Sequence, residues 1–283
     1  MKKMVIAILA LITIGMLVPT GFAADANVVA TYGESTLSNS QYKSIVDSFF
    51  VNNAGVDMSN VDTKTITASQ VNEISGSITG KYYNSNQIFS SALVDLTKND
   101  HLEVNVDKSK ITTITGDMYI SALKSAGITK GTVYVTSPVT ATGESALAGI
   151  MNSYEAATDV EIPDSVKEAA NNEIYTEAEI VNNSNISADE LSTLVDDVKE
   201  QVSRENITNQ TTIKNIINNY VENNNINITN SDIQNLAGSI EQVQNVQGDV
   251  NHYKTQVNEF LGNTTDGNFT VDSILDMIKS FFG

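Results

Sequence analysis

The sequence predicts an α+β (mixed α/β) protein: a small mixed sheet with packed helices, followed by a helical C-terminal half. Two patterns favour this fold class. Short β-branched segments recur through the first half of the chain. From about Pro163 onward, apolar residues recur at the three- and four-residue spacing of amphipathic helices. We therefore divide the chain into a leader at 1–26, an α/β domain at 27–160 and an Asn-rich helical region at 161–283.

The α/β domain is expected to open on a strand and a helix. The segment NVVATYGE is of β type and ends near Gly33. Ser38 stands three residues before Gln41, which predicts a capping box with Ser38 as the N-cap. The helix that follows is indicated by apolar residues at helical spacing, namely Tyr42, Ile45, Val46, Phe49 and Phe50. The segment TKTITAS is expected to be extended and to lead into a helix at about 69–79.

Residues 87–137 form the expected centre of the sheet. QIFSSALVDL, HLEVNVDKSKITTIT and GTVYVTSP are β-rich, and Pro138 should end the last strand. Between them, Thr115 is predicted to cap a helix that Gly127 ends in the left-handed conformation. In the helical region, Pro163 suits a first helical turn, and Ser187 to Glu190 reads as a second capping box. Three apolar stripes predict a bundle or array of helical hairpins there.

Composition excludes several classes of function. The chain has 16 Lys+Arg against 34 Asp+Glu, for a net charge of −18, and its single Arg is Arg204. A nucleic-acid interface needs clustered cations, so we expect no nucleic-acid partner. The absence of Cys excludes disulfides and a thiolate nucleophile. We expect no cofactor, no dedicated metal site and only weak cation binding by the acidic surface.

The first 26 residues have the features of a secretory signal peptide. A basic start at Lys2 and Lys3 precedes an apolar run at 4–18, and small residues at 23–26 suit cleavage. A retained membrane anchor is the alternative, although a span usually takes about 20 apolar residues. The apolar face at 271–282 is expected to pack on the core and not to lie on a membrane. We therefore expect a secreted or cell-surface protein with no transmembrane span after removal of the leader.

Residues 111–155 carry a family resemblance. The segment ITTITGDMYISALKSAGITKGTVYVTSPVTATGESALAGIMNSYE is similar to the hallmark of the secreted bacterial and archaeal proteins grouped as domain-of-unknown-function family 1002. The matching positions include Met118, Tyr119, Ala122, Leu123, Ala126, Gly127, Ile128, Pro138, Gly143, Tyr154 and Glu155. Thr142 departs from the pattern, which favours Ser there. The resemblance implies export, a mixed α/β body and no assigned activity, and it supplies no catalytic residues.

The loop that follows the last predicted strand is the main candidate ligand-binding segment. It precedes a helix whose amide N–H groups could bind an anion, and its hydroxyls could add donors. In the alternative interpretation, Thr142 or Ser145 only caps that helix, Gly143 permits a tight turn and Glu144 repels phosphate. The candidate ligand-binding residues are Thr136, Ser137, Thr140, Thr142, Gly143 and Ser145.

Other motifs are weaker. Ser40 with Lys43, and Ser121 with Lys124, have the Ser-x-x-Lys spacing of penicillin-recognising enzymes, which chance also produces. His101 and His252 are expected to lie on the surface, and Asp266-Gly-Asn268 is only part of a calcium loop. We identify no catalytic residue. Candidate N-glycosylation sites, from Asn-x-Ser/Thr sequons, are Asn182, Asn185, Asn206, Asn209, Asn227, Asn263 and Asn268.

These observations favour an exported binding or structural module, whose partner is an unknown protein or a component of the cell envelope. Two alternatives stay open. One is an exported hydrolase with a Ser or Thr nucleophile, supplied by the 136–145 loop or a Ser-x-x-Lys pair. The other is an adhesin or envelope-assembly protein whose glycosylated helices meet a partner.

Overall fold

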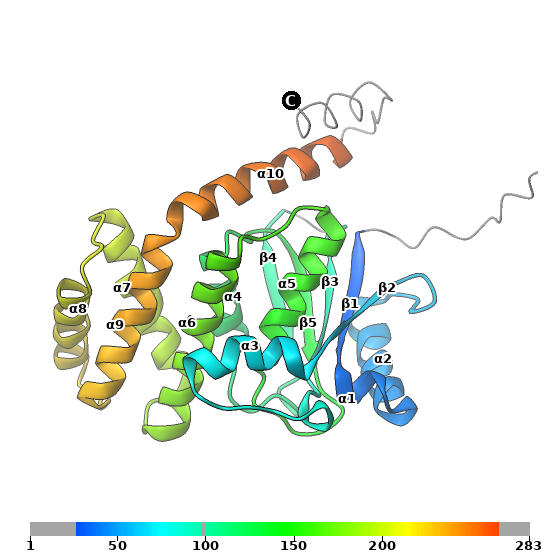
Figure 1. Cartoon of the computed structure of the whole chain (residues 1–283), viewed down its shortest axis with the longest axis horizontal. Coiled ribbons are helices and arrows are strands. Elements are labelled where there is room, and N and C mark those ends of the chain that lie inside the picture. Colours follow the sequence, from blue (N-terminus) through cyan, green and yellow to red (C-terminus); the bar gives the residue numbers. More distant parts are fainter. Residues whose placement is uncertain (1–26, 98–99, 266–283) are drawn as a thin grey trace, which may run out of the picture.

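The computed structural model describes residues 27–97 and 100–265, so the leader, Asp266-Gly-Asn268 and the 271–282 face lie outside the described residues. Within these ranges, one sheet has the strand order β2-β1-β3-β5-β4 (Figure 1). The strands are β1 (Val28–Gly33), β2 (Asp62–Ile66), β3 (Ser91–Asp95), β4 (Leu102–Val106) and β5 (Gly131–Thr136). This is an α+β fold, as the sequence predicts.

Strand direction brings most strand ends to one edge of the sheet. β1 pairs in parallel with β2, and β4 pairs in parallel with β5. The central strand β3 is antiparallel to both of its neighbours, β1 and β5. As a result β1, β2, β4 and β5 all run the same way and end at a common edge. We call this the carboxyl edge of the sheet.

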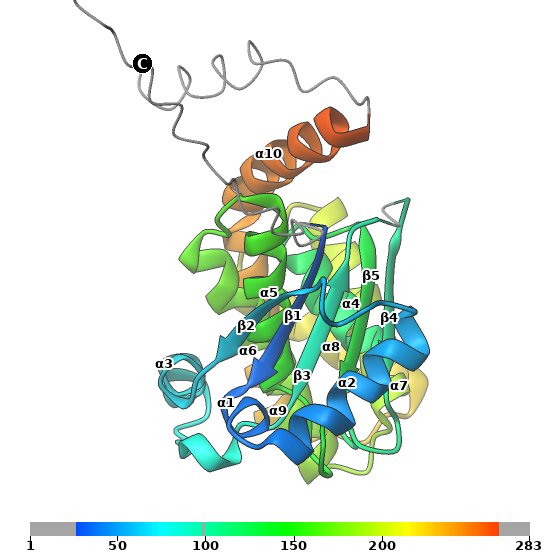
Figure 2. The ribbon, with the colours of Figure 1, turned by 90° about the vertical axis from the view of Figure 1, so that its right-hand side faces the viewer.

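Helices cover both faces of the sheet (Figure 2). Alternate strand residues point to opposite faces, so Ala30 and Leu93 pack toward α2 (Ser40–Ala54), whereas Val29 and Val94 lie in the core on the other side. That second side is covered by α5 (Ser145–Thr158), which crosses β1, β2 and β3, and by α4 (Gly116–Ser125), which packs on β4. Shorter elements complete the α/β part: α1 (Glu34–Leu37), α3 (Ala68–Ile78) and the 3-10 turn η1 (Ser85–Gln87).

Of the helix caps predicted at Ser38, Thr115 and Ser187, the first is wrong and the other two residues do cap their helices. The N-cap of α2 is Asn39, whose side chain accepts from the amide N of Gln41 at 3.0 Å. Ser38 instead donates to the carbonyl of Glu34 at 2.7 Å, because it ends α1. Thr115 caps α4 as predicted, and Gly127 has the left-handed φ of 79° expected after it. Ser187 caps α7 (Ala188–Arg204), since its hydroxyl accepts from the amide N of Glu190 at 3.2 Å, but the return bond of the predicted capping box is not found among the described residues.

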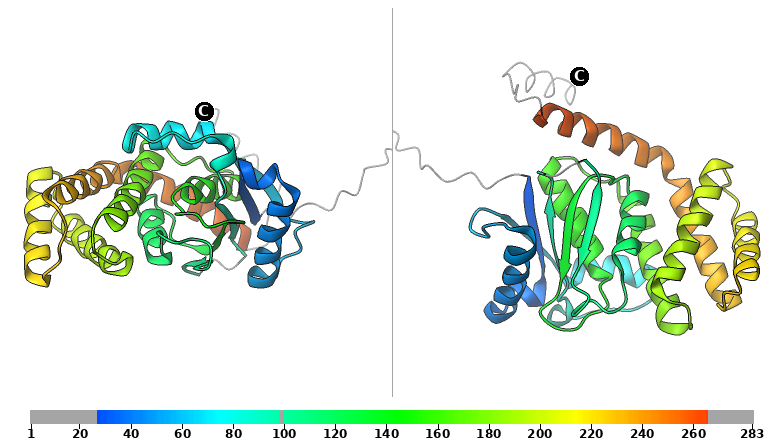
Figure 3. Two further views of the ribbon diagram at one scale, coloured as in Figure 1. Left: turned by 90° about the horizontal axis from the view of Figure 1, so that it is seen from below. Right: turned by 180° about the vertical axis from the view of Figure 1, so that it is seen from behind.

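The helical half consists, among the described residues, of α6 (Asp164–Asn183), α7 (Ala188–Arg204), α8 (Gln210–Asn224), α9 (Asn230–Asn245) and α10 (Gln247–Thr265) (Figure 3). Side chains from α7, α8 and α9 form a second apolar core. The first core extends past residue 160, because Ile174 of α6 and Tyr253 of α10 belong to it. Helix α6 therefore contributes to both cores.

No helix in the described part of the chain combines the length and apolar character that spanning a bilayer requires.

Candidate functional site

A hollow of about 300 Å³ opens at the carboxyl edge of the sheet, beside the loop between β5 and α5. Ligands of open α/β sheets commonly bind outside the carboxyl ends of the strands. We call this space the edge hollow. It is lined by Val71, Tyr83, Gln87, Ile88, Phe89, Ser90, Thr140, Ala141, Thr142, Glu144, Ser145 and Tyr175.

The β5–α5 loop is held in place by its neighbours. The amide N of Ala141 donates to the carbonyl of Lys110 at 2.9 Å, and the amide N of Ile114 donates to the carbonyl of Thr142 at 3.1 Å. Gly143 has a φ of 115°, and a Cβ there would lie 2.8 Å from the buried hydroxyl of Tyr119. That hydroxyl donates to the Gly143 carbonyl at 2.6 Å. The wall of the edge hollow is thus fixed by hydrogen bonds before any ligand binds.

The structure brings three of the six predicted ligand-binding residues together. Thr140, Thr142 and Ser145 line the edge hollow. Thr136 is buried and donates to a carboxylate oxygen of Asp107 at 2.8 Å. Ser137 is buried as well, and its hydroxyl has no partner among the described residues. Gly143 shapes the turn, as described above.

The start of α5 is less suited to an anion than the sequence suggests. The residue before its first turn is Glu144, and no side chain caps the helix, so the prediction that Thr142 or Ser145 caps it is wrong. The Thr142 hydroxyl donates to the Glu144 carboxylate instead. The amide N of Ala146 is already used, since it donates to the Gly143 carbonyl at 2.9 Å. The Glu144 carboxylate beside the first turn of α5 therefore opposes the binding of an anion there.

Two tyrosines that the sequence patterns did not single out complete the edge hollow. Tyr175 of α6 is 4% exposed and Tyr83 is half-buried, and neither hydroxyl has a hydrogen-bond partner among the described residues. Burial raises the pKa of both phenols, and the nearby Glu144 carboxylate raises each pKa further. Both hydroxyls thus stay protonated at neutral pH and are free to donate.

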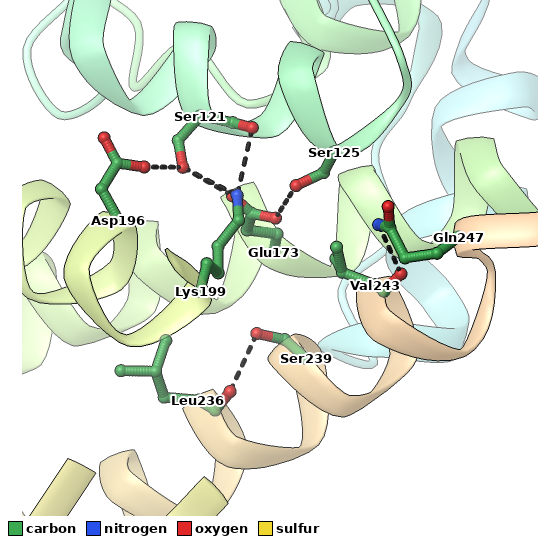
Figure 4. A network of polar contacts seen from close by, with 9 residues as sticks. All are labelled: Ser121, Ser125, Glu173, Asp196, Lys199, Leu236, Ser239, Val243 and Gln247. Carbon is green, nitrogen blue, oxygen red and sulfur yellow. Dashed lines mark hydrogen bonds and ion pairs between the residues drawn. The ribbon is translucent and has the colours of Figure 1, made fainter. Parts of the chain in front are cut away.

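A second polar cluster lies between α4, α6 and α7 (Figure 4). Lys199 Nζ donates to Glu173 Oε1 at 2.6 Å, to Ser121 Oγ at 2.9 Å and to the Ser121 carbonyl at 3.2 Å. Ser121 Oγ lies 2.6 Å from a carboxylate oxygen of Asp196, and Ser125 donates to Glu173 at 2.7 Å. We call these five residues the interhelix network. It ties the α/β part to the helical half.

The interhelix network does not form a Ser–Lys nucleophile. Ser121 is fully buried, while Lys124 of its Ser-x-x-Lys motif is exposed. Lys199 Nζ donates to three acceptors, which uses all three donors of its ammonium group, and an ammonium group has no acceptor site with which to take the proton of Ser121. In the other Ser-x-x-Lys motif, Lys43 pairs with Asp47 at 2.6 Å and Ser40 is exposed. Neither motif is therefore a catalytic dyad.

Glu177 lies one turn beyond Glu173 on α6 and is also fully buried. Neither of its carboxyl oxygens has a hydrogen-bond partner among the described residues. Burial, and next the charge of Glu173, raise its pKa well above the ordinary value. A sequence signal was present, because both glutamates fall on the apolar stripe of α6 that contains Val166 and Ala170.

The remaining candidates lie apart from both sites. His101 and His252 are exposed, and the described residues contain no group of three or more His, Cys, Asp or Glu that could hold a metal ion. Five sequon asparagines are exposed, namely Asn182, Asn185, Asn206, Asn209 and Asn227. The side chains of Asn263 and Asn268 lie outside what the structure describes.

Comparison with known proteins places the chain in a family. Residues 32–260 match the model of the family described as "Protein of unknown function (DUF1002)". The chain belongs to this family. A curated relative, "Uncharacterized protein YpuA" of Bacillus subtilis (strain 168), is 28% identical over 297 residues, which span 100% of this chain and 97% of YpuA. No solved structure matches. The edge hollow and the interhelix network both lie within the matched residues of this DUF1002 protein.

Proposed function

We propose that this DUF1002 protein is an exported binding module, secreted or held at the cell surface, whose edge hollow binds a small hydroxyl-bearing ligand. The observation that carries the proposal is a pair of tyrosines, Tyr83 and Tyr175, that line the edge hollow and whose hydroxyls have no hydrogen-bond partner among the described residues. Neither hydroxyl is among the buried groups that lack a partner, so both are accessible from solvent. Two such accessible hydroxyls in one hollow favour a ligand that accepts from them.

The size and lining of the edge hollow support a small polar ligand. Its volume of about 300 Å³ is at the lower end of the range of roughly 300–1,000 Å³ found for small-molecule sites. Aromatic and apolar walls are contributed by Tyr175 and Ile88, and hydroxyls by Thr140 and Ser145. This combination of apolar walls with a few placed polar groups is typical of ligand sites.

Export is supported by the leader. Its basic start, apolar run and small residues are those of a signal peptide. N-terminal sequencing of the protein from its native host tests this directly. A mature chain that starts near residue 24–27 is expected, and a retained Met1 would contradict export by cleavage.

The binding site is tested with a variant that fills the edge hollow. Thr140 is exposed, lines the hollow and makes no hydrogen bond among the described residues, so Thr140→Trp should fold normally and obstruct ligands. Saturation-transfer NMR with a mixture of neutral, cationic and anionic monosaccharides and amino alcohols should give signals with the wild type. The signals should be lost with T140W and kept with Thr193→Trp, a matched change at an exposed position on α7. No signal with the wild type, or equal signals with T140W, would contradict the proposal.

The exposed sequons support a second proposal, that the helical half carries glycans where the host has the machinery. Intact mass of the protein from its native host decides this. A mass equal to that of the unmodified mature chain would exclude it.

A further inference from the structure

We infer that the ligand of the edge hollow is a small hydroxylated organic cation, such as an amino sugar or an amino alcohol, whose ammonium group lies against Glu144. This inference rests on the proposed function, because it takes the edge hollow to be a binding site and specifies the charge and chemistry of its ligand.

The charge of the lining carries the inference. Among the described residues that line the edge hollow, Glu144 is the one with a charged side chain. Glu144 is half-buried, and its carboxylate accepts a hydrogen bond from the neutral hydroxyl of Thr142. No basic side chain in the described part of the chain pairs with it. An opposite charge within about 4–6 Å favours the charged form of a carboxylate, so a ligand cation beside Glu144 would be attracted to it.

The neighbouring ion pair adds little net charge. Glu179 of α6 and Lys81 pair with each other at 3.2 Å, so each largely compensates the charge of the other and the Glu144 carboxylate stays without a counter-charge. The chain as a whole carries a net charge of −18. A cation is therefore drawn toward this site and an anion is repelled.

The neutral part of the lining accounts for the hydroxyls of the ligand. Tyr83 and Tyr175 line the edge hollow, and a tyrosine ring that presented its face to it would attract alkylated or primary ammonium groups at distances up to about 6 Å. Their hydroxyls, with those of Thr140 and Ser145, can donate to and accept from a hydroxylated ligand. A bare metal ion fits less well, because Ca²⁺ takes about 6–8 oxygen ligands and often several carboxylates.

Two matched ligand series test the inference. D-glucosamine, D-glucose and D-glucuronate share one sugar ring and are cationic, neutral and anionic. In an acyclic series, choline and 3,3-dimethylbutanol have the same shape and differ in charge, and 3,3-dimethylbutyrate carries a carboxylate in place of the hydroxyl. Titration near pH 6, by calorimetry or NMR, should show that at least one cation binds about tenfold more tightly than its neutral partner, which is ~1.4 kcal/mol. The anions should bind most weakly. Equal binding of cation and neutral partner in both series would overturn the inference.

The role of Glu144 is tested by Glu144→Gln, which keeps the shape of the side chain and removes its charge. In E144Q the preferred cation should bind only as well as its neutral partner, and the affinity of that neutral partner should be unchanged. Glu200→Gln, which removes a charge from the exposed end of α7, is the control and should keep the preference. A preference that survives in E144Q would also overturn the inference.

Failure of this inference can be told apart from failure of the proposed function. If neutral and cationic ligands bind equally and T140W abolishes both, the edge hollow is a binding site and only the charge assignment is wrong. If cations bind wild type, E144Q and T140W alike, they bind elsewhere and the inference is wrong. If nothing in the mixture binds the wild type, the proposed function and the inference fall together.

Discussion

Lys199 of α7 holds the carboxylate of Glu173 on α6 at 2.6 Å, and the side chain of Glu173 is 0% exposed. This ion pair joins a helix of the α/β core to a helix of the second core. A buried charge is costly unless it is paired. The pair therefore makes the docking of α7 on α6 depend on a single cation.

Loss of that cation should destabilise the fold. Lys199→Met leaves Glu173 buried without a counter-charge, and removing one partner of a buried pair costs about 3–5 kcal/mol. Because Lys199 is 16% exposed, we expect a value near the lower end, about 3 kcal/mol. Urea unfolding measures it, with the exposed Lys124→Met as the control, which should change stability by less than about 0.5 kcal/mol. Adding Glu173→Gln to K199M should recover part of the loss, and no recovery would contradict this account.

The buried carboxyl of Glu177 should make stability fall as pH rises. The pKa of Glu177 is raised in the folded state, so its carboxyl group binds a proton more tightly in the folded than in the unfolded chain. The contribution of this proton to folding stability is fully present below the ordinary pKa of 4.5 and is lost as pH rises through the higher, folded value. Glu177→Gln mimics the protonated carboxyl at every pH. Denaturant unfolding should thus find E177Q and wild type similar near pH 4, with E177Q the more stable at pH 9. A stability difference that is independent of pH would show that Glu177 does not titrate in this way.

Gly143 should be intolerant of a side chain. Gly143→Ala places a Cβ 2.8 Å from Ile111 and from the Tyr119 hydroxyl, at a φ of 115° that L-residues rarely adopt. We expect a loss of about 1–3 kcal/mol in unfolding free energy, together with weaker binding at the edge hollow. Gly248→Ala is the matched control, because a Cβ there meets nothing within 4 Å. If G143A were as stable as G248A, the loop would be more adaptable than its hydrogen bonds indicate.

Ser121 should not react as a nucleophile. It is fully buried, and its hydroxyl lies between Lys199 and two carboxylates. A fluorophosphonate or penicillin probe should therefore leave the native protein unlabelled. Labelling of the wild type that disappears in Ser121→Ala would revive the hydrolase alternative.

Much of the fold follows from local patterns, but the arrangement of the strands does not. The strands at β1 and β5 are β-branched and wholly buried, and Thr115 and Gly127 mark the ends of α4. The antiparallel β3 between two parallel pairs was not predictable, because strand pairing depends on contacts between segments distant in the sequence. The predicted N-cap of α2 was wrong because the sequence patterns did not indicate the short helix α1. Ser38 is the C-cap of α1, where its hydroxyl donates to the carbonyl of Glu34, and so it does not cap α2.

In the candidate site, the residues of the local loop could be predicted from the sequence, whereas the residues brought in by tertiary packing could not. The β5–α5 loop is local, and its strand, glycine and helix start identified Thr140, Thr142 and Ser145. Tyr83, between α3 and η1, and Tyr175 of α6 are far from this loop in the sequence, and only tertiary packing brings them to it. The contact between Ser121 and Lys199 is equally nonlocal, so a spacing motif pointed to Lys124 instead.

The most direct test of the edge hollow is to map binding on the protein by NMR. Amide chemical shifts of ¹⁵N-labelled protein, followed as D-glucosamine or choline is added, should change for residues 83–90 and 140–146 and stay constant across α7 and α8. Saturable changes confined to those residues are the result we predict. Changes centred elsewhere, or none at concentrations where calorimetry detects binding, would contradict the assignment of the ligand to the edge hollow.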